Sequence, residues 1–153
     1  MLPNVTFLQV VASDFDALAD FRVAAMRESL ERVGRFDPMR ARERLRSNFS
    51  PQHTLFILVE DAKVGFYATR PTPEGLQLDH LYVHPDYQSR GIGGIVLRSI
   101  TSEADRRGIP VLVGALKESA SNRFYQRHGF ALSKEEDWDN YYVRPASITP
   151  EEG

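Results

Sequence analysis

The sequence contains no cysteine among its 153 residues. This absence excludes disulfide bonds, thiolate metal ligands and a cysteine nucleophile, so any group transfer by this chain must proceed without a cysteine-bound intermediate. The sequence also has no apolar run close to the roughly 20 residues that span a bilayer. The stretch Met1–Asn4 does not begin a basic segment followed by an apolar one. We therefore expect a cytoplasmic location and no membrane partner.

A strong excess of charge of one sign is also missing. The chain has 19 Lys and Arg against 21 Asp and Glu, a formal net charge of -2, which predicts no nucleic-acid partner. The spacing of His53, His84 and His128 is not that of metal ligands, so we expect no metal. A hydrophobic content of 42% and a charged content of 26% are typical of a globular protein. The length predicts a single domain over residues 1–153, with a frayed tail over about 146–153.

Apolar periodicity and the Gly and Pro breaks predict a mixed α/β fold. A strand is followed by two helices, then three strands, a helix, a strand, a helix and two strands. The expected strands cover residues 4–11, 54–59, 64–69, 76–83, 111–116, 130–133 and 141–144. The expected helices end near residue 32, cover 39–48, begin at 91 and include residue 125.

The most informative segment joins a strand to a helix through closely spaced glycines. The strand ends at Val83, Pro85 interrupts it, and the helix begins around Gly91, Gly93 and Gly94. Glycine lets a ligand approach the backbone closely, and the first turn of a helix leaves four N–H groups without intrahelical partners. Such a turn suits a phosphate or pyrophosphate.

Two common nucleotide-binding loops do not fit this segment. A P-loop ends in Gly-Lys-Ser/Thr, whereas Gly93 is followed by Gly94 and Ile95. A dinucleotide-binding turn has a third glycine or alanine where this chain has Val96. The pattern that does fit is Gln/Arg-x-x-Gly-x-Gly/Ala, matched by Gln88, Gly91 and Gly93.

This pattern resembles the GNAT superfamily of acyl-coenzyme A (CoA)-dependent N-acetyltransferases. The resemblance implies a mostly antiparallel, twisted sheet with a splayed central strand pair, flanked by about four helices. It implies acetyl-CoA as acyl donor, with its pyrophosphate held by residues Gln88, Ser89, Arg90, Gly91, Ile92, Gly93 and Gly94. It also implies that the strand end Leu81, Tyr82 and Val83 pairs with the pantetheine, where a main-chain N–H polarises the thioester oxygen.

A second segment, residues 121–130, resembles the family's other CoA-binding element, a helix ending in aromatic-Tyr-x-x-x-Gly-Phe. The resemblance implies that Tyr125 lies near the sulfur and protonates the departing thiolate; the alternative is a tyrosine packed in the core. It also implies cofactor contacts for Asn122 and for Ser119, which stands where many relatives have asparagine. A serine hydroxyl can still cap the helix or contact the cofactor.

Transfer to an amine requires that the amine lose a proton. Many relatives place a glutamate base where this chain has Gln77, so the candidates become Asp79 and His80. Strand alternation places these two side chains on opposite faces. His80 has a suitable intrinsic pKa, whereas Asp79 would need burial or an intervening water. A structural role for either residue is equally compatible with the sequence.

The sequence thus predicts an enzyme that transfers an acetyl group directly to a primary amine of a small molecule or peptide. The first alternative is a catalytically silent CoA-binding sensor or regulatory module, since Gln77 and Ser119 replace common family residues. The second is a nucleotide-binding protein that uses the same anion-binding turn. The resemblance also makes a homodimer an expectation.

Overall fold

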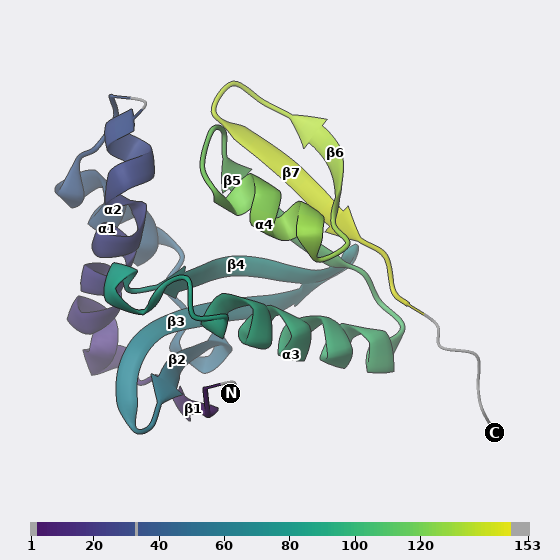
Figure 1. Cartoon of the computed structure of the whole chain (residues 1–153), viewed down its shortest axis with the longest axis horizontal. Coiled ribbons are helices and arrows are strands. Elements are labelled where there is room, and N and C mark those ends of the chain that lie inside the picture. The colour runs from purple at the N-terminus through teal and green to yellow at the C-terminus, as the bar shows by residue number, and fades with distance from the viewer. Residues whose placement is uncertain (1–2, 33, 148–153) are drawn as a thin grey trace. The chain divides into compact units, whose positions relative to one another are not determined.

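The computed structural model describes residues 3–32 and 34–147. Within them, seven strands and four α-helices follow the predicted order, with three short 3-10 turns between them. The chain forms two compact units (Figure 1). Unit 1 comprises Met1–Ala68 and His80–Gly93, and unit 2 comprises Thr69–Asp79 and Gly94–Gly153.

The strands form a mostly antiparallel sheet in the order β1-β2-β3-β4-β5-β7-β6. Strands β4 (Gly75–Val83) and β5 (Val111–Leu116) are parallel, and their register covers only Leu76↔Val111 to Leu78↔Val113. Both strands continue further, with no other β4–β5 pair among the described residues. The described β4–β5 pairing thus ends before the last residues of either strand, in agreement with the predicted splay. The predicted fold class is confirmed.

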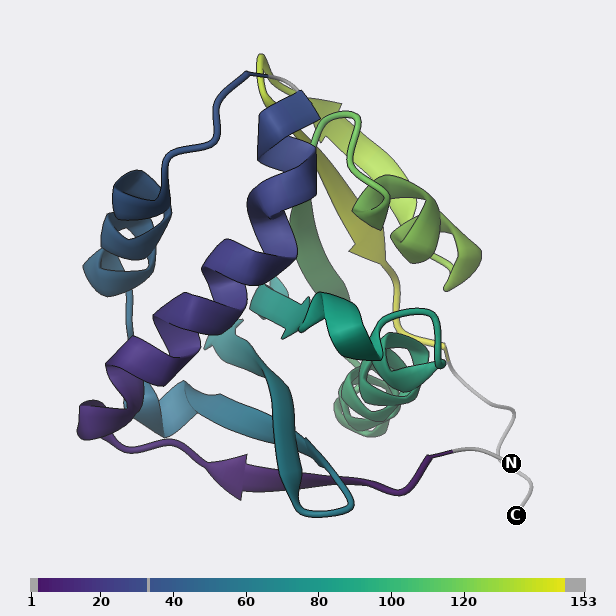
Figure 2. The ribbon, with the colours of Figure 1, turned by 60° about the vertical axis from the view of Figure 1, so that its left-hand side comes forward.

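Unit 1 packs two helices against a hairpin. Its complete elements are β1 (Val5–Gln9), α1 (Phe15–Arg32), α2 (Pro38–Ser47) and β2 (Thr54–Val59), joined by the first part of β3 (Ala62–Thr72) and the end of β4. Figure 2 shows α1 as one long helix beside strands β1 to β3. The core contains Leu18 from α1, Leu45 from α2, and Phe56 and Phe66 from the hairpin, all at most 1% exposed. These side chains hold α1 on the sheet by apolar burial.

A close backbone contact brings β3 against the end of β4 in unit 1. A Cβ on Gly65 would lie 2.0 Å from the Tyr82 carbonyl oxygen, so only glycine fits at this position. The His84 amide also donates to the Val64 carbonyl at 2.8 Å. The end of β4 is therefore held firmly where the anion-binding turn begins.

Unit 2 contains α3 from Gly94 onward and the last four elements. These are β5, α4 (Ser121–Arg127), β6 (Ala131–Glu135) and β7 (Asp139–Arg144), with α3 spanning Ile92–Arg107. In Figure 1, β7 lies between β5 and β6, with α4 beside them. Asp105 accepts two hydrogen bonds from Arg144, at 2.8 and 3.1 Å, and one from the Ser147 amide at 2.8 Å. The ion pair between Asp105 and Arg144 thus joins the end of α3 to the end of β7.

The bounds differ from the predicted ones mainly at strand ends. The first strand is shorter than predicted, because the chain enters a 3-10 turn at Ala12. Ser147, inside the predicted tail, is bonded to Asp105, whereas residues 148–153 lie outside the described part of the chain. No helix in the described ranges is long and apolar enough to cross a membrane.

Candidate active site

The predicted anion-binding turn begins directly after β4. A 3-10 turn, Pro85–Tyr87, follows the strand, and the Gln88 side chain donates back to the Val83 carbonyl at 2.8 Å. Ser89 and Gly91 both adopt left-handed conformations, with φ of 65° and 83°. Helix α3 then begins at Ile92. These two left-handed residues lie in the short connection between the 3-10 turn and helix α3.

The turn leaves its backbone amides without acceptors. Within the described chain, the amides of Ser89, Arg90 and Gly91 donate no hydrogen bond. The next amides belong to the first turn of α3 and have no intrahelical carbonyl to bind. Free N–H groups at the positive end of a helix of this length fit a phosphate or pyrophosphate. Arg90 is held by its own bond to the Asp86 carbonyl at 3.1 Å and by the Tyr87 ring.

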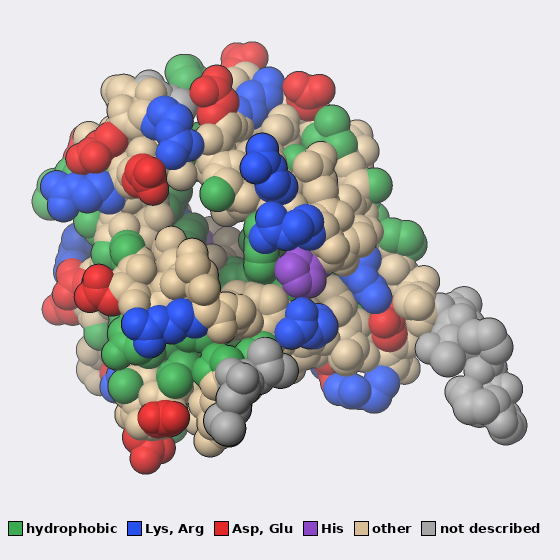
Figure 3. Space-filling model, viewed as in Figure 1, with side chains coloured by type: hydrophobic (Ala, Val, Ile, Leu, Met, Phe, Trp, Pro, Cys, Tyr) green, Lys and Arg blue, Asp and Glu red, His purple; other side chains and the backbone are tan. Residues whose placement is uncertain are grey.

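Two basic side chains lie at the start of α3 in unit 2. A Cβ on Gly94 would lie 3.2 Å from Arg98 Nη1 and 3.2 Å from His128 Nε2. His128 Nδ1 donates to the Phe124 carbonyl at 2.9 Å, because a carbonyl can only accept, so Nε2 is the nitrogen that faces Gly94. Figure 3 shows Lys and Arg side chains gathered around one histidine over α3 and α4. The electrostatic character here suits an anion.

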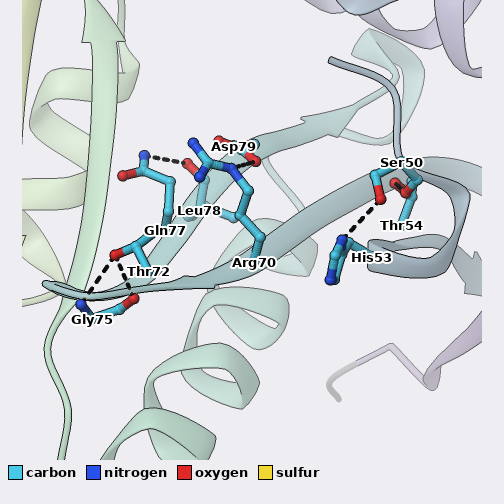
Figure 4. Close-up of polar contacts among 9 residues, drawn as sticks. All are labelled: Ser50, His53, Thr54, Arg70, Thr72, Gly75, Gln77, Leu78 and Asp79. Carbon is cyan, nitrogen blue, oxygen red and sulfur yellow. Dashed lines mark hydrogen bonds and ion pairs between the residues drawn. The ribbon is translucent and has the colours of Figure 1, made fainter.

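The polar residues of β4 alternate as predicted. Leu78 and His80 are buried, whereas Gln77 and Asp79 are only half-buried. Asp79 Oδ2 accepts from Arg70 Nε at 2.7 Å across the neighbouring strand (Figure 4). Gln77 donates to the Leu78 carbonyl at 3.4 Å. Arg70 therefore occupies one oxygen of the Asp79 carboxylate, and the other has no hydrogen-bond partner among the described residues.

His80 lies inside unit 1, in contact with Arg22 of α1. Its Nδ1 lies 3.5 Å from Arg22 Nη1, and the same Nη1 donates to the Tyr82 hydroxyl at 2.7 Å. Burial, and secondarily the positive charge of Arg22, lower the pKa of His80 to about 3. His80 is therefore neutral at physiological pH. A guanidinium only donates, so Nδ1 is the acceptor and Nε2 carries the proton.

Helix α4 holds Tyr125 in an aromatic cluster. The residue is 6% exposed, and its ring centroid lies 5.4 Å from that of Phe130 and 6.3 Å from that of Tyr142. The helix has no side-chain cap, so Ser119 does not cap it. The Ser119 carbonyl and hydroxyl instead accept from Asn122 Nδ2, at 3.0 and 3.4 Å.

The Asn122 amide is used entirely within unit 2. Nδ2 also donates to the Leu116 carbonyl at 2.9 Å, and Oδ1 accepts from Asn140 at 2.9 Å and Tyr142 at 2.8 Å. An amide has two donors and two lone pairs, so no capacity remains for a ligand. The geometry thus gives the Asn122 side chain a structural task, and its predicted cofactor contact stays a prediction.

The sequence indicated the turn, Asp79, His80 and Tyr125 as candidates but not three arginines that lie beside such residues. Arg22, Arg70 and Arg98 each lie beside one of the predicted site residues. The position of Arg98, one helical turn after Gly94, was a local signal that could have indicated it. No local signal indicates Arg22, which is separated from His80 by 58 positions along the chain.

Comparisons with known proteins agree with this geometry. A family model described as acetyltransferase (GNAT) domain matches residues 51–132. The PaiA N-acetyltransferase of Thermoplasma acidophilum, solved in complex with coenzyme A, has a TM-score of 0.75 at 14% identity, covering 93% of this chain and 99% of that one. The ribosomal-protein-S18-alanine N-acetyltransferase of Escherichia coli has a TM-score of 0.70 at 17% identity, covering 97% and 98%. No curated protein matches the sequence.

The turn after β4, the splayed strand pair and these matches define an acyl-CoA-dependent acyltransferase. The chain belongs to the GNAT acetyltransferase superfamily. Enzymes of this family use acetyl-CoA and acetylate amine acceptors. The solved structures are less than 25% identical to this chain and show the fold alone.

Proposed function

We propose that this protein transfers the acetyl group of acetyl-CoA directly to a primary amine, with a small molecule as first choice of acceptor and a peptide as second. The observation that carries the proposal is the turn of residues 88–94, where left-handed Ser89 and Gly91 leave consecutive backbone amides free. Both units are proposed to form one acetyltransferase domain, which the match to whole solved chains supports. A homodimer stays a prediction.

The residues present fit acetyl-CoA. Its pyrophosphate is proposed to bind the amides of residues 89–94, with the guanidinium of Arg98 on the same helix adding positive charge. The end of β4, residues 81–83, is proposed to bind the pantetheine through its main chain, as the resemblance to the family implies. When bound, the cofactor supplies an electrophilic thioester carbonyl. Of the predicted cofactor contacts, Asn122 is the one whose hydrogen bonds argue against it.

The proton of the acceptor amine is proposed to leave through Asp79 and a water molecule. His80 has its lone pair on Nδ1, facing the guanidinium of Arg22, and a pKa of about 3, both of which make it a poor base. Asp79 keeps one oxygen that Arg70 does not occupy. Arg70 also holds the carboxylate in a fixed orientation. We therefore favour Asp79 over His80, two candidates that the sequence left open.

Tyr125 is proposed to supply the proton that the thiolate takes up as it leaves. Its burial among Phe124, Phe130 and Tyr142 fixes the ring, because large side chains in a packed aromatic cluster have little rotational freedom. A fixed hydroxyl is what a general acid needs.

The proposal is tested by thermal unfolding with acetyl-CoA, ATP or NAD. Ligand at 100 times its Kd adds about 2.7 kcal/mol, which corresponds to about 5 to 10 °C here. Gly91→Ala should reduce the acetyl-CoA shift. Gly108→Ala is a matched control, since both glycines have positive φ, of 83° and 69°, and open space around the missing Cβ. Both variants should lose similar stability from backbone strain, but only Gly91→Ala should lose cofactor binding.

The outcomes separate the alternatives. Selective stabilisation by acetyl-CoA with amine-dependent thiol release supports the acetyltransferase. Stabilisation without thiol release for any amine indicates a CoA-binding sensor. Equal stabilisation by ATP, NAD and acetyl-CoA, or none by any of them, contradicts the proposed function.

A further inference from the structure

Arg22 is a buried cation whose neighbours are neutral. It is 7% exposed on α1, and its guanidinium carbon lies 5.5 Å from the centroid of the Tyr82 ring. Nη1 donates to the Tyr82 hydroxyl and faces His80 Nδ1. Neither partner is a carboxylate, because one is the hydroxyl of Tyr82 and the other is the neutral imidazole of His80.

No carboxylate compensates this charge. Guanidinium stays protonated at any physiological pH. Arg70 and Arg144 each pair with an aspartate, whereas Arg22 has no ion pair among the residues that the structure describes. A buried charge without a counter-charge is costly, and proteins normally retain one only where a ligand or a functional group requires it.

Several N–H donors at this place lack acceptors. Arg22 Nε and His80 Nε2 are fully enclosed and have no hydrogen-bond partner in the described chain. Arg22 Nη2 also makes no recorded bond there, yet it is not fully enclosed, so it remains open to a ligand. Because Nδ1 of His80 is the acceptor for Arg22, its Nε2 carries a hydrogen. Buried donors normally have partners, so their number here indicates a missing acceptor.

We propose that Arg22 binds a carboxylate of the acceptor, so that the acceptors of this enzyme are small amines that carry a carboxylate, such as amino acids. A carboxylate bound at Arg22 Nη2 would supply the missing counter-charge and an acceptor for this nitrogen, because guanidinium groups bind carboxylates through charge-assisted hydrogen bonds. His80 is a positioning residue that accepts from Nη1 and thereby orients the guanidinium. This inference rests on the proposed function and adds the chemical class of the acceptor.

The test uses the twenty standard amino acids, each paired with its C-terminal carboxamide, as acceptors with acetyl-CoA. The wild type should prefer at least one acid over its carboxamide by about 30-fold or more in kcat/KM, since the carboxamide removes the charge but keeps the amine. Arg22→Gln should remove most of this preference, and Arg22→Lys should retain part of it. Arg27→Gln, an exposed arginine of the same helix paired with Glu31, is the control and should leave the preference unchanged.

Stability and cofactor binding provide readouts that distinguish this site from a structural arginine. Arg22→Gln should keep or raise Tm, because it removes an uncompensated charge, and should keep the acetyl-CoA stabilisation. A large fall in Tm would show a structural role and overturn the inference.

Acceptor results overturn it in two further ways. Equal rates of transfer to acids and to carboxamides would refute the carboxylate site. Transfer to peptides with a blocked C-terminus would refute it too, if Arg22→Gln leaves that rate unchanged. The proposed function stands in both cases. Transfer to none of the forty compounds, with acetyl-CoA binding intact, also counts against the carboxylate site. Loss of selective acetyl-CoA binding in the wild type refutes the proposed function itself.

Discussion

The burial of neutral His80 makes the protein sensitive to acid. The folded pKa is lowered to about 3, first by desolvation and then by Arg22, whereas the unfolded chain has a histidine pKa of about 6.5. Below pH 6.5 the unfolded chain therefore binds a proton that the folded chain does not. The stability contributed by neutral His80 is complete above pH 6.5 and is lost as the pH falls from 6.5 toward 3.

Between pH 7 and pH 5 this difference should remove about 2 kcal/mol from the free energy of unfolding, or about 4 to 8 °C of Tm. The loss at pH 5 depends almost entirely on the unfolded pKa, because the folded residue is still neutral there. The expected loss of stability therefore does not depend on the exact pKa of His80 in the folded chain, as long as that pKa lies well below 5.

Urea unfolding at pH 7 and pH 5 measures this loss. The wild type should lose about 2 kcal/mol more than His80→Gln over this interval. His53→Gln is the matched control, since His53 is half-buried and bonded to Ser50 at 2.8 Å, and it should lose as much as the wild type. Equal losses in the wild type and His80→Gln, or an NMR titration of His80 with a midpoint near 6.5, would refute the reasoning.

Three further predictions concern unit 2. Tyr125→Phe should lower turnover roughly 100-fold with acetyl-CoA affinity retained, and unchanged turnover would remove Tyr125 from the mechanism. Arg98→Gln and His128→Gln should each weaken acetyl-CoA binding about 10-fold in a calorimetric titration, and unaltered affinity would separate them from the cofactor site. Asp105→Asn should lower the free energy of unfolding by about 1 to 2 kcal/mol, whereas Glu103→Gln, on the exposed side of α3, should leave it unchanged. Equal effects of these two substitutions would contradict the tether between α3 and β7.

The fold was predictable because its signals are local. The strand Val111–Leu116 lies between Pro110 and a turn, and its predicted and observed bounds agree. Alternation along β4 correctly placed Asp79 and His80 on opposite faces, and the structure shows that His80 lies on the buried one. The strand bounds were least accurate at β3, which was predicted over residues 64–69 and covers Ala62–Thr72, because pairing with the neighbouring strands extends it.

The turn between β4 and α3 was predictable for the same reason, since its glycines lie close together in the sequence, and its anion binding stays a prediction. The environments of the candidate bases were not predictable. Arg70 reaches Asp79 from the neighbouring strand, and Arg22 reaches His80 from a helix far away in the chain. These contacts depend on tertiary packing. The intrinsic pKa values favour His80 over Asp79 as the base, whereas the contacts in the structure favour Asp79.

The hydrogen bonds of the Asn122 side chain make the C-terminal strand necessary for the position of Tyr125. Helix α4 has seven residues, far fewer than the roughly 12 to 15 that an isolated helix needs for stability in water. Its Asn122 is anchored to Asn140 and Tyr142, which lie on the last strand. A chain shortened before Asp139 would thus leave α4 without its anchor, and Tyr125 would lose its fixed place even though its own segment is intact. The final hairpin, which contains no predicted catalytic residue, is therefore a condition for positioning one.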